Sequence, residues 1–411
     1  MLLYSMFETS RNMFFHPLEK SAKLMEPIFS TPSPLGFIQG AKETKALLNL
    51  TGRVNQDYDK PEWKIDTTTV DNSEFQIEIT EVVKNTFCNL LHFKKVGFKE
   101  NLPTLLIVAP LSGHYPTLLR DTVKNLLPTH DIFITEWINV KNIPVYFGDF
   151  SLDDYVRYVI QFLQYLHQDG RLVHMLSICQ PTVPSLVAQS LMAQRNDPAQ
   201  ARSMIMVGGP IDARKSPTSV NNFGTKYDID WFERNVISMV PYPYKGMGRM
   251  VYPGFLQHFG FVSMNPTRHL EAHKKYFEDL TKGDDSSVNK HREFYDEYNA
   301  VMDLPKTYYL QTIKKVFQDF DLPKGNMVID NQKVEPSAIK NCALLTIEGE
   351  LDDISGAGQT HSAHDLCSSI SNESRVQKTF EGVGHYGIFS GSKFKNEIVP
   401  FISKFTQENN S

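Results

Sequence analysis

The sequence predicts an α/β fold with a mostly parallel, doubly wound sheet and an inserted helical cap. Its short apolar runs are continuous rather than alternating, which is typical of strands buried on both faces. Helical patterns lie between these runs, so that β and α elements alternate along the chain. One long interval, 212–341, has no strong strand run and is rich in aromatic residues and prolines. We interpret this interval as the cap.

The expected elements follow one another in a regular order. Segments 74–83 and 86–95 are expected to form two paired strands. The buried strands are expected at 104–110, 131–137, 174–179, 203–209 and 343–349, with a further strand-like segment at 375–380. Helices are expected at 115–127, 152–167, 185–195, 359–369 and 393–407. The strand runs and the helices between them predict a parallel sheet covered on both faces.

These patterns divide the chain into four parts. They are an N-terminal helical segment and linker (1–70), the first part of the core (71–211), the inserted helical cap or lid (212–341) and the C-terminal part of the core (342–411). Near the N-terminus, apolar residues recur at helical spacing, which predicts one or two amphipathic helices. We expect these helices to pack on the body of the protein, because they lack basic enrichment and a sustained apolar face. The alternative is contact with an apolar surface such as a lipid or polymer particle.

Composition narrows the class of protein. The chain has 411 residues, of which 41% are hydrophobic and 22% charged, as in an ordinary globular protein. A net charge of −5 gives no reason to expect nucleic acid as a partner. The four cysteines lie far apart, which argues against a disulfide scaffold. With neither a secretory signal nor an apolar run long enough for a membrane span, we expect a cytoplasmic protein without integral membrane association. The sequence does not predict an oligomeric state.

One of the cysteines, Cys179, lies where an apolar run stops and a helical pattern begins. An α/β-hydrolase places its nucleophile at such a strand-to-helix turn, usually within the pattern G-x-S-x-G. Here Ser177 is small enough for the first position of that frame. Pro181 occupies the last position and is compatible with the first turn of a helix. Cys179 is therefore a candidate nucleophile in an α/β-hydrolase fold.

Candidates for the acid and the base follow in the chain order that this fold uses, nucleophile, acid and then histidine. Asp352 and Asp353 lie in a turn after the expected strand 343–349, and His385 lies in a glycine-rich loop after 375–380. Each residue alone has a plainer interpretation, as a buried thiol, a solvated turn or a structural histidine. Their common order at strand ends, where catalytic groups of parallel sheets converge, favours a catalytic set. Either carboxylate could orient the imidazole.

These residues suggest a mechanism. At a helix N-terminus and beside His385, the thiol is expected to lose its proton more readily than a free cysteine and to attack an ester carbonyl. The oxyanion would be held by the backbone N–H of Gln180 and by that of Leu111 or Ser112. His385 would protonate the leaving alcohol and then activate water. His114, in the same loop as Leu111, could assist, although we favour a packing role.

The sequence points to no cofactor and no metal. It contains no Walker-type phosphate loop, no dinucleotide fingerprint and no spaced set of metal ligands. His361 and His364 stand at a ligand-like interval, but without further partners they are better explained as one face of a helix.

Several stretches resemble the intracellular polyhydroxyalkanoate (polyhydroxybutyrate) depolymerases of bacteria. They are 108–114, 118–122, 179–184, 208–212, 251–255, 260–265, 294–299, 348–356 and 382–387. The resemblance extends from about Glu81 to the last expected helix. It implies an α/β-hydrolase that cleaves the stored polyester of (R)-3-hydroxybutyrate at the surface of cytoplasmic granules. It also implies a triad of Cys179, Asp352 and His385, and so favours Asp352 over Asp353.

Two other functions stay open. Polyhydroxyalkanoate synthases are related to these depolymerases and also use a cysteine triad on this fold, so that a hydroxyacyl end could resolve the acyl-enzyme instead of water. The third possibility is a non-catalytic granule protein in which the triad is coincidental.

Overall fold

The centre of the protein is a nine-stranded sheet with the strand order β1-β2-β3-β5-β4-β6-β7-β13-β14. We describe it from a computed structural model, which covers residues 2–30, 33–99, 101–264 and 266–410. The strands are β1 (Thr67–Val70), β2 (Ser73–Val83), β3 (Cys88–Lys95), β4 (Thr104–Val108), β5 (Asp131–Trp137), β6 (Val173–Ile178), β7 (Ser203–Val207), β13 (Ala343–Gly349) and β14 (Arg375–Phe380).

Most of this sheet is parallel. From β5 across β4, β6, β7 and β13 to β14 every pairing is parallel, whereas β1, β2 and β3 add an antiparallel edge that joins at β5. The continuous apolar runs therefore occupy the places expected of strands buried on both faces. The predicted fold class, an α/β-hydrolase with a mostly parallel sheet, is confirmed.

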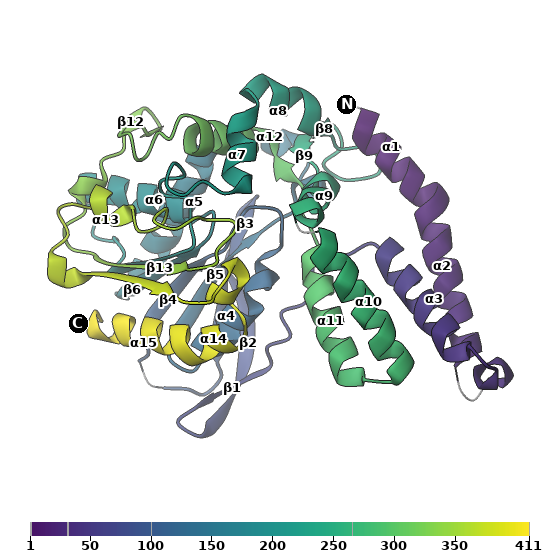
Figure 1. Ribbon diagram of the computed structural model, residues 1–411. Helices are drawn as coiled ribbons and strands as arrows, with labels where there is room; N and C mark the ends of the chain where they lie inside the picture. The colour runs from purple at the N-terminus through teal and green to yellow at the C-terminus, as the bar shows by residue number, and fades with distance from the viewer. Residues whose placement is uncertain (1, 31–32, 100, 265, 411) are drawn as a thin grey trace.

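Helices cover both faces of the sheet. Figure 1 shows α5 (Leu152–His167) and α6 (Thr182–Gln194) on one face, and α4 (Arg120–Leu126) and α15 (Val399–Glu408) on the other. Helix α5 begins at the predicted residue, because Ser151 and Asp154 form a reciprocal capping box. The first turn of the helix predicted at 115–127 is instead a 3₁₀ turn, Pro116–Leu119.

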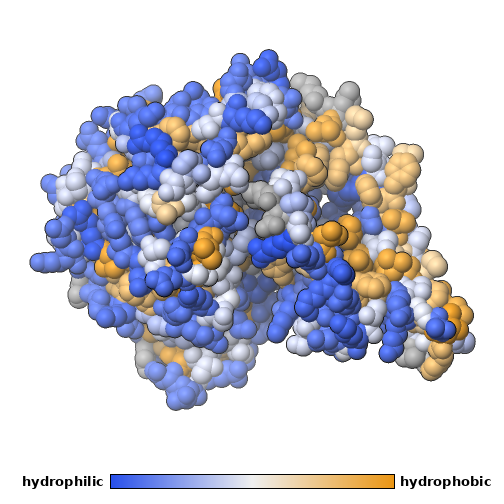
Figure 2. All heavy atoms as spheres, viewed as in Figure 1, coloured by the Kyte–Doolittle hydropathy of each residue, from blue (hydrophilic) through white to orange (hydrophobic). Residues whose placement is uncertain are grey.

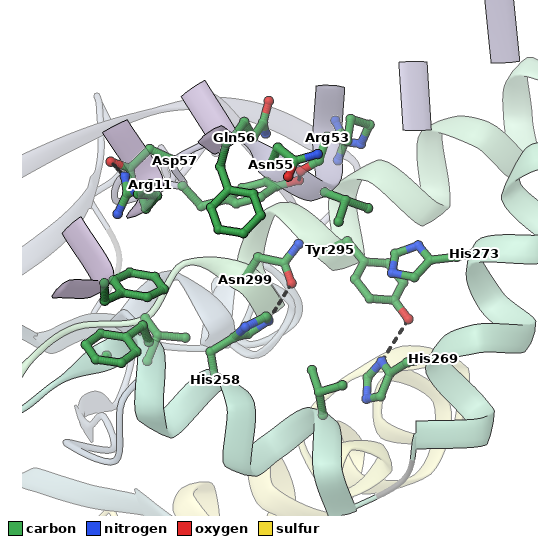
Figure 3. Close-up of a pocket in the computed structure, with 18 of the residues that line it drawn as sticks. Arg11, Arg53, Asn55, Gln56, Asp57, His258, His269, His273, Tyr295 and Asn299 are labelled. Carbon is green, nitrogen blue, oxygen red and sulfur yellow. Dashed lines mark hydrogen bonds and ion pairs between the residues drawn. The ribbon is translucent and has the colours of Figure 1, made fainter. Parts of the chain in front are cut away.

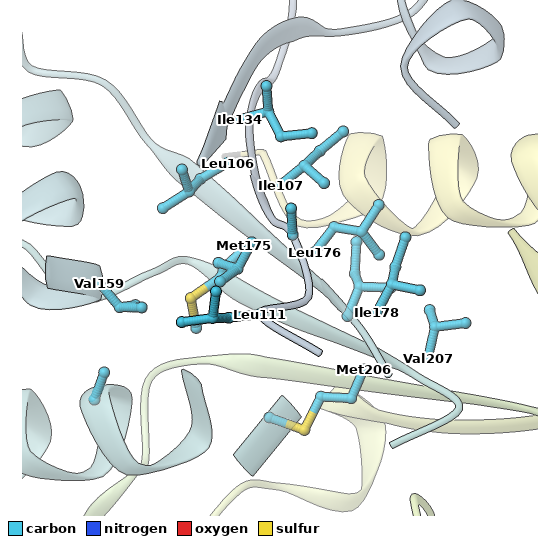
Figure 4. Close-up of a cluster of buried hydrophobic side chains, with 14 of the residues drawn as sticks. Leu106, Ile107, Leu111, Ile134, Val159, Met175, Leu176, Ile178, Met206 and Val207 are labelled. Carbon is cyan, nitrogen blue, oxygen red and sulfur yellow. The ribbon is translucent and has the colours of Figure 1, made fainter. Parts of the chain in front are cut away.

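The core lies between the sheet and these helices. Figure 4 shows Leu106 of β4, Ile134 of β5, Met175 of β6 and Met206 of β7 among the apolar side chains gathered there. Each of these side chains is at most 1% exposed. This packing makes the carboxyl ends of β4, β6, β7 and β13 a rigid base for the loops that follow them.

The helix predicted at 359–369 is mostly wrong. Only α13 (Ala363–Leu366) is helical, and the residues before it form turns. The reason is long-range, since the buried carboxylate of Glu348 in β13 accepts backbone N–H groups from Gly358, Thr360 and His361 at 2.8 to 2.9 Å. Those N–H groups are thereby held in a turn around one side chain.

Between β7 and β13 the chain forms the helical insertion that the sequence predicts. Its helices are α7 (Ser219–Lys226), α8 (Ile229–Val236), α9 (Gly254–Met264), α10 (Pro266–Lys282), α11 (Asp285–Asn299) and α12 (Lys306–Thr312), which runs on into a π-helical stretch (Ile313–Gln318). Its short strands are β8 (Ser238–Met239), β9 (Met250–Tyr252), β10 (Leu304–Pro305), β11 (Val328–Ile329) and β12 (Gln332–Lys333). Strands of two or three residues leave no periodic signal, so the sequence did not predict them. The domain boundaries proposed above stay a prediction.

The N-terminal segment is a long arm of helices. It comprises α1 (Leu2–Ser10), a π-helical stretch (Arg11–Phe15), α2 (His16–Met25) and α3 (Ala41–Asn55), and Figure 1 shows it beside α10 and α11. The π-helical stretch precedes Pro17, which has no N–H to bond the carbonyl of Met13. The predicted amphipathic helices are present.

One face of the arm packs on the body and the other is exposed. Tyr4 is buried with its hydroxyl 2.7 Å from Asp303, and the ring of Phe7 stacks on Phe255 at 3.9 Å. On the outer face Phe14 is 66% exposed and Leu24 75% exposed. Figure 2 shows this apolar surface over the arm. The arm therefore packs on the body of the protein, as we expected, and it also has the exposed apolar surface that contact with a lipid or polymer particle would require.

The helices of the described part include none with the length and apolar character needed to cross a bilayer.

Candidate active site

Cys179 forms a sharp turn between β6 and α6. Its φ angle of 67° lies in the left-handed region, which non-glycine residues rarely adopt. The turn is held from both sides, because the N–H of Cys179 donates to the carbonyl of Val207 at 2.7 Å and the Thr182 hydroxyl donates to the carbonyl of Cys179 at 2.9 Å. Cys179 is half-buried, whereas the other three cysteines are buried. The backbone has the form of a nucleophile elbow.

Asp352 and His385 lie together at the ends of β13 and β14. The Nδ1 atom of His385 is 2.8 Å from Oδ2 of Asp352, and both side chains are buried. The other oxygen of Asp352, Oδ1, accepts the N–H groups of Ile354 at 2.9 Å and Ser355 at 2.8 Å. Asp353, by contrast, is exposed. The carboxylate paired with the histidine is therefore that of Asp352.

The remaining nitrogen of His385 faces Cys179. Burial lowers the pKa of His385, but charge and hydrogen-bond interactions with Cys179 and Asp352 outweigh it and raise this pKa to about 10. The imidazolium form is thus favoured between a sulfur and a carboxylate. Such a pair is suited to an activated cysteine.

We predict that His385 carries two protons at pH 7 and loses one near pH 10. Because the folded pKa is raised, the stability that this charge adds is fully present below pH 6.5 and is lost as the pH rises through about 10. Titration of the imidazole Cε1–Hε1 resonance by NMR measures this pKa. In the Cys179→Ala variant the pKa should fall, because Cys179 is its largest raising cause. An unchanged pKa in that variant would contradict the interaction.

The two segments expected to form the oxyanion hole are in contact. The N–H of Leu111 donates to Oε1 of Gln180 at 3.2 Å, so of Leu111 and Ser112 it is Leu111 that points at residue 180. The loop is anchored at Ala109, whose carbonyl accepts from Trp137 Nε1 at 2.8 Å and from the Tyr155 hydroxyl at 3.0 Å. The Gln180 side-chain oxygen thus lies where a substrate oxygen could accept from Leu111.

The other histidines singled out by the sequence have packing partners. His114 is buried, with Nε2 3.1 Å from the carbonyl of Tyr298 and its ring stacked on Phe261 at 4.7 Å. His361 and His364 both contact the hydroxyl of Thr346 at 2.6 and 2.9 Å. The prediction that they lie on one face of a helix is therefore wrong, since only His364 is in α13. What the two histidines have in common is the hydroxyl of Thr346 as a hydrogen-bonding partner. In the described ranges no group of three or more His, Cys, Asp or Glu side chains has the arrangement of a metal site.

Two residues that support the site were missed by the sequence reasoning. Gly208 follows β7 with φ of 55°, and a Cβ there would lie 2.4 Å from Cδ1 of Ile388 and 3.3 Å from Oδ2 of Asp352. Glu348 is 2% exposed and holds the turn 358–361 described above. Its position inside an apolar run was the one available signal, since a buried carboxylate requires partners.

We predict that Glu348→Gln destabilises the protein by about 2 kcal/mol or more, because an amide nitrogen cannot accept and would leave a buried N–H group unpaired. Urea denaturation measures the loss. The matched control is Glu350→Gln, since Glu350 is exposed and accepts a single N–H, from Gly382 at 2.8 Å. It should cost less than about 1 kcal/mol. Equal losses in the two variants would contradict this account of Glu348.

Strand order and the elbow define the class of protein, an α/β-hydrolase. Among solved structures, similar ones include a monoglyceride lipase from Saccharomyces cerevisiae (TM-score 0.47, 12% identity, 87% of this chain and 98% of that one). Another is an esterase from Thermogutta terrifontis (TM-score 0.40, 12% identity, 84% and 98%).

Sequence comparison points to polyhydroxyalkanoate enzymes. Residues 208–410 match the family model described as PHB de-polymerase C-terminus. The chain is 25% identical over 317 residues to the poly(3-hydroxyalkanoate) polymerase subunit PhaC of Allochromatium vinosum, covering 75% of this chain and 81% of that protein. It is 23% identical over 323 residues to the subunit of the same name from Thiocystis violacea, with the same coverage. The chain is therefore an α/β-hydrolase similar in sequence to enzymes of polyhydroxyalkanoate metabolism.

Proposed function

We propose that the protein is a polyhydroxyalkanoate depolymerase, which hydrolyses ester bonds of stored poly(3-hydroxybutyrate) through a thioester on Cys179. The observation that carries this proposal is the strained elbow at Cys179 together with the buried pair of His385 and Asp352. The match to the depolymerase family model supports it, because residues 208–410 include both members of that pair.

In the proposed reaction, the sulfur of Cys179 attacks the ester carbonyl carbon. The oxyanion that forms accepts N–H groups from Gln180 and, once the Gln180 side chain turns away, from Leu111. His385 gives its proton to the leaving alkoxide, and the C–O bond breaks to leave a thioester. Neutral His385 then takes a proton from water, whose oxygen attacks the thioester. The C–S bond then breaks, the hydroxy acid leaves, and the site returns to its starting state with the proton taken from water on His385.

Asp352 is a positioning residue in this scheme. Its Oδ2 accepts from Nδ1 of His385, which directs the other ring nitrogen to the sulfur and to the leaving oxygen. Its Oδ1 is held by two backbone N–H groups, so the carboxylate keeps one orientation while the proton moves.

The proposed partner is the granule surface. The arm supports it, because its exposed apolar side chains would lie against a polyester as they would against a lipid. The location that follows is the surface of polyhydroxyalkanoate granules in the cytoplasm.

The second candidate is an acyltransferase that extends the polymer. The two relatives that cover most of this chain are named polymerase subunits, and on that ground they favour transfer over hydrolysis. The same thioester would serve both reactions, with a hydroxyl end of the polymer replacing water. The difference therefore lies in the acceptor rather than in the triad.

One experiment separates the candidates. The wild-type protein is incubated with amorphous poly(3-hydroxybutyrate) granules and, separately, with 3-hydroxybutyryl-CoA, with the Cys179→Ala variant alongside. Release of soluble hydroxy acids from granules by the wild type alone is expected. Growth of polymer with release of CoA would overturn hydrolysis in favour of the transferase. If Cys179→Ala released acids as fast as the wild type, the role of Cys179 would fall, leaving a granule protein or another nucleophile.

A further inference from the structure

A cavity of about 570 Å³ lies between the N-terminal arm and the helices α9, α10 and α11. Figure 3 shows Arg11, Asp57 and Arg53 from the arm and the chain after it on one side, and His258 and His269 on the other. Its apolar wall includes Phe7, Phe15, Val54, Phe255, Val262 and Leu270. The size and the mixed lining are those of a small-molecule site.

The polar lining includes four imidazoles from three helices. His258 Nε2 lies 2.9 Å from Oδ1 of Asn299, and His269 Nδ1 lies 2.9 Å from the hydroxyl of Tyr295. In contrast, both ring nitrogens of His291 and Nδ1 of His273 are buried without a partner among the described residues. A neutral imidazole offers one donor and one acceptor. The lining therefore holds unused groups of both kinds just beneath its surface, and a small rotation of the rings would turn them into the cavity.

Two of the three cations around the cavity are paired with carboxylates. Arg11 is paired with Asp57, Arg53 lies 2.6 Å from Asp296, and Lys141 lies over an aromatic ring. Burial lowers the pKa of all four histidines, that of His291 to about 4, so they are neutral at pH 7. Of these three cations only Lys141 has no ion-pair partner among the described residues, so an anion would meet little uncompensated positive charge. The wall is better matched to a neutral ligand with several oxygen atoms.

The cavity shares a wall with the loop that carries Leu111. The N–H of Met302 donates to the carbonyl of Gly113 at 2.6 Å, and His114 bonds to the carbonyl of Tyr298. In the segment 298–303, Tyr298 and Met302 contact this loop, whereas Asn299, Val301 and Asp303 line the cavity. A ligand here would lie against the segment that supports the proposed oxyanion loop.

We propose that this cavity is a second binding site, distinct from Cys179, for the hydroxyl-terminated end of an oligo(hydroxyalkanoate). The substrate class rests on the function proposed above. Ester carbonyls would accept from the imidazole N–H groups, the terminal hydroxyl would donate to an imidazole nitrogen, and the methyl groups would contact the apolar wall. The site would hold one end of the polymer while the triad acts on another bond.

The test uses the Cys179→Ala variant, so that the ligand is not consumed, and the methyl ester of linear 3-hydroxybutyrate trimer as the probe. NMR of the imidazole Cε1–Hε1 groups locates binding, and the affinity is read from the shifts of His269. Trimer should shift the resonances of His273 and His291. A second substitution, His291→Phe, should weaken binding by about tenfold or more, since it removes both unused nitrogens and keeps a ring of similar size. His273→Phe, on another helix, serves the same purpose if the first variant does not fold.

The matched control is His167→Phe at the end of α5, which should leave the affinity unchanged. The inference is overturned if trimer leaves the His273 and His291 resonances unmoved, if His291→Phe and His273→Phe bind it as well as their parent, or if decanol binds as tightly as trimer. Granule hydrolysis by the wild type is measured separately. Hydrolysis without binding in the cavity overturns this site alone, whereas binding without hydrolysis overturns the depolymerase function alone.

Discussion

Replacing Cys179 by alanine is expected to lower hydrolysis of poly(3-hydroxybutyrate) by about 10³-fold or more, because no thioester can then form. His385→Ala should have a comparable effect, since it removes the proton donor and the base. The measurement is the rate at which soluble hydroxy acids appear from granules at a fixed concentration of folded enzyme. Together, the two variants test the elbow and its base as one unit.

Two other cysteines provide the controls. Cys342 and Cys367 are buried, and burial raises the pKa of both thiols, that of Cys367 to about 12. They are therefore inert thiols packed in the core. Cys342→Ala and Cys367→Ala should each cost about 1 kcal/mol of stability and leave the rate per folded molecule unchanged. A large loss of rate at unchanged stability would count against Cys179 as the nucleophile.

The parts of this protein that could be predicted from sequence are those set by neighbouring residues. The strand runs are continuous because each strand is covered on both faces, and helix α5 begins at its capping box. The elbow could also be anticipated, since a small residue, a cysteine and a proline surround one turn. The order of Cys179, an aspartate and His385 along the chain, each after a strand, also predicted that they meet at one edge of the sheet.

What could not be predicted depends on contacts between distant segments. Segment 359–362 has a helical pattern, but Glu348 from β13 binds its N–H groups and holds it in turns. The cavity joins Phe7 and Arg11 to His258 and His291, about 250 to 280 residues further along the chain. No local pattern signals such a site, because each histidine alone is typical of an amphipathic helix.

The choice between Asp352 and Asp353, which the residues alone left open, leads to a second large effect. In Asp352→Asn, the two N–H groups of Ile354 and Ser355 keep the amide oxygen at the position of Oδ1. The amide NH₂ group then donates a hydrogen bond to Nδ1 of His385, so Nδ1 must be unprotonated. The proton of the neutral imidazole is then held on the other ring nitrogen, which can no longer act as the base. We expect the turnover rate to fall about 10³- to 10⁴-fold, as when the equivalent carboxylate of other triads becomes an amide.

Asp353→Asn is the matched control, because it makes the same chemical change one residue away on an exposed side chain. Its turnover rate should stay within about twofold of the wild type. The Asp352→Asn variant should also show a lower pKa for His385, since Asp352 is one of the groups that raise it.

A rate loss in Asp353→Asn equal to that in Asp352→Asn would mean that the loop moves during the reaction. A rate loss in Asp353→Asn alone would assign the orienting role to the other carboxylate. The pKa of His385 separates a lost partner from a misfolded loop, because only a lost partner lowers the pKa while the native fold is retained.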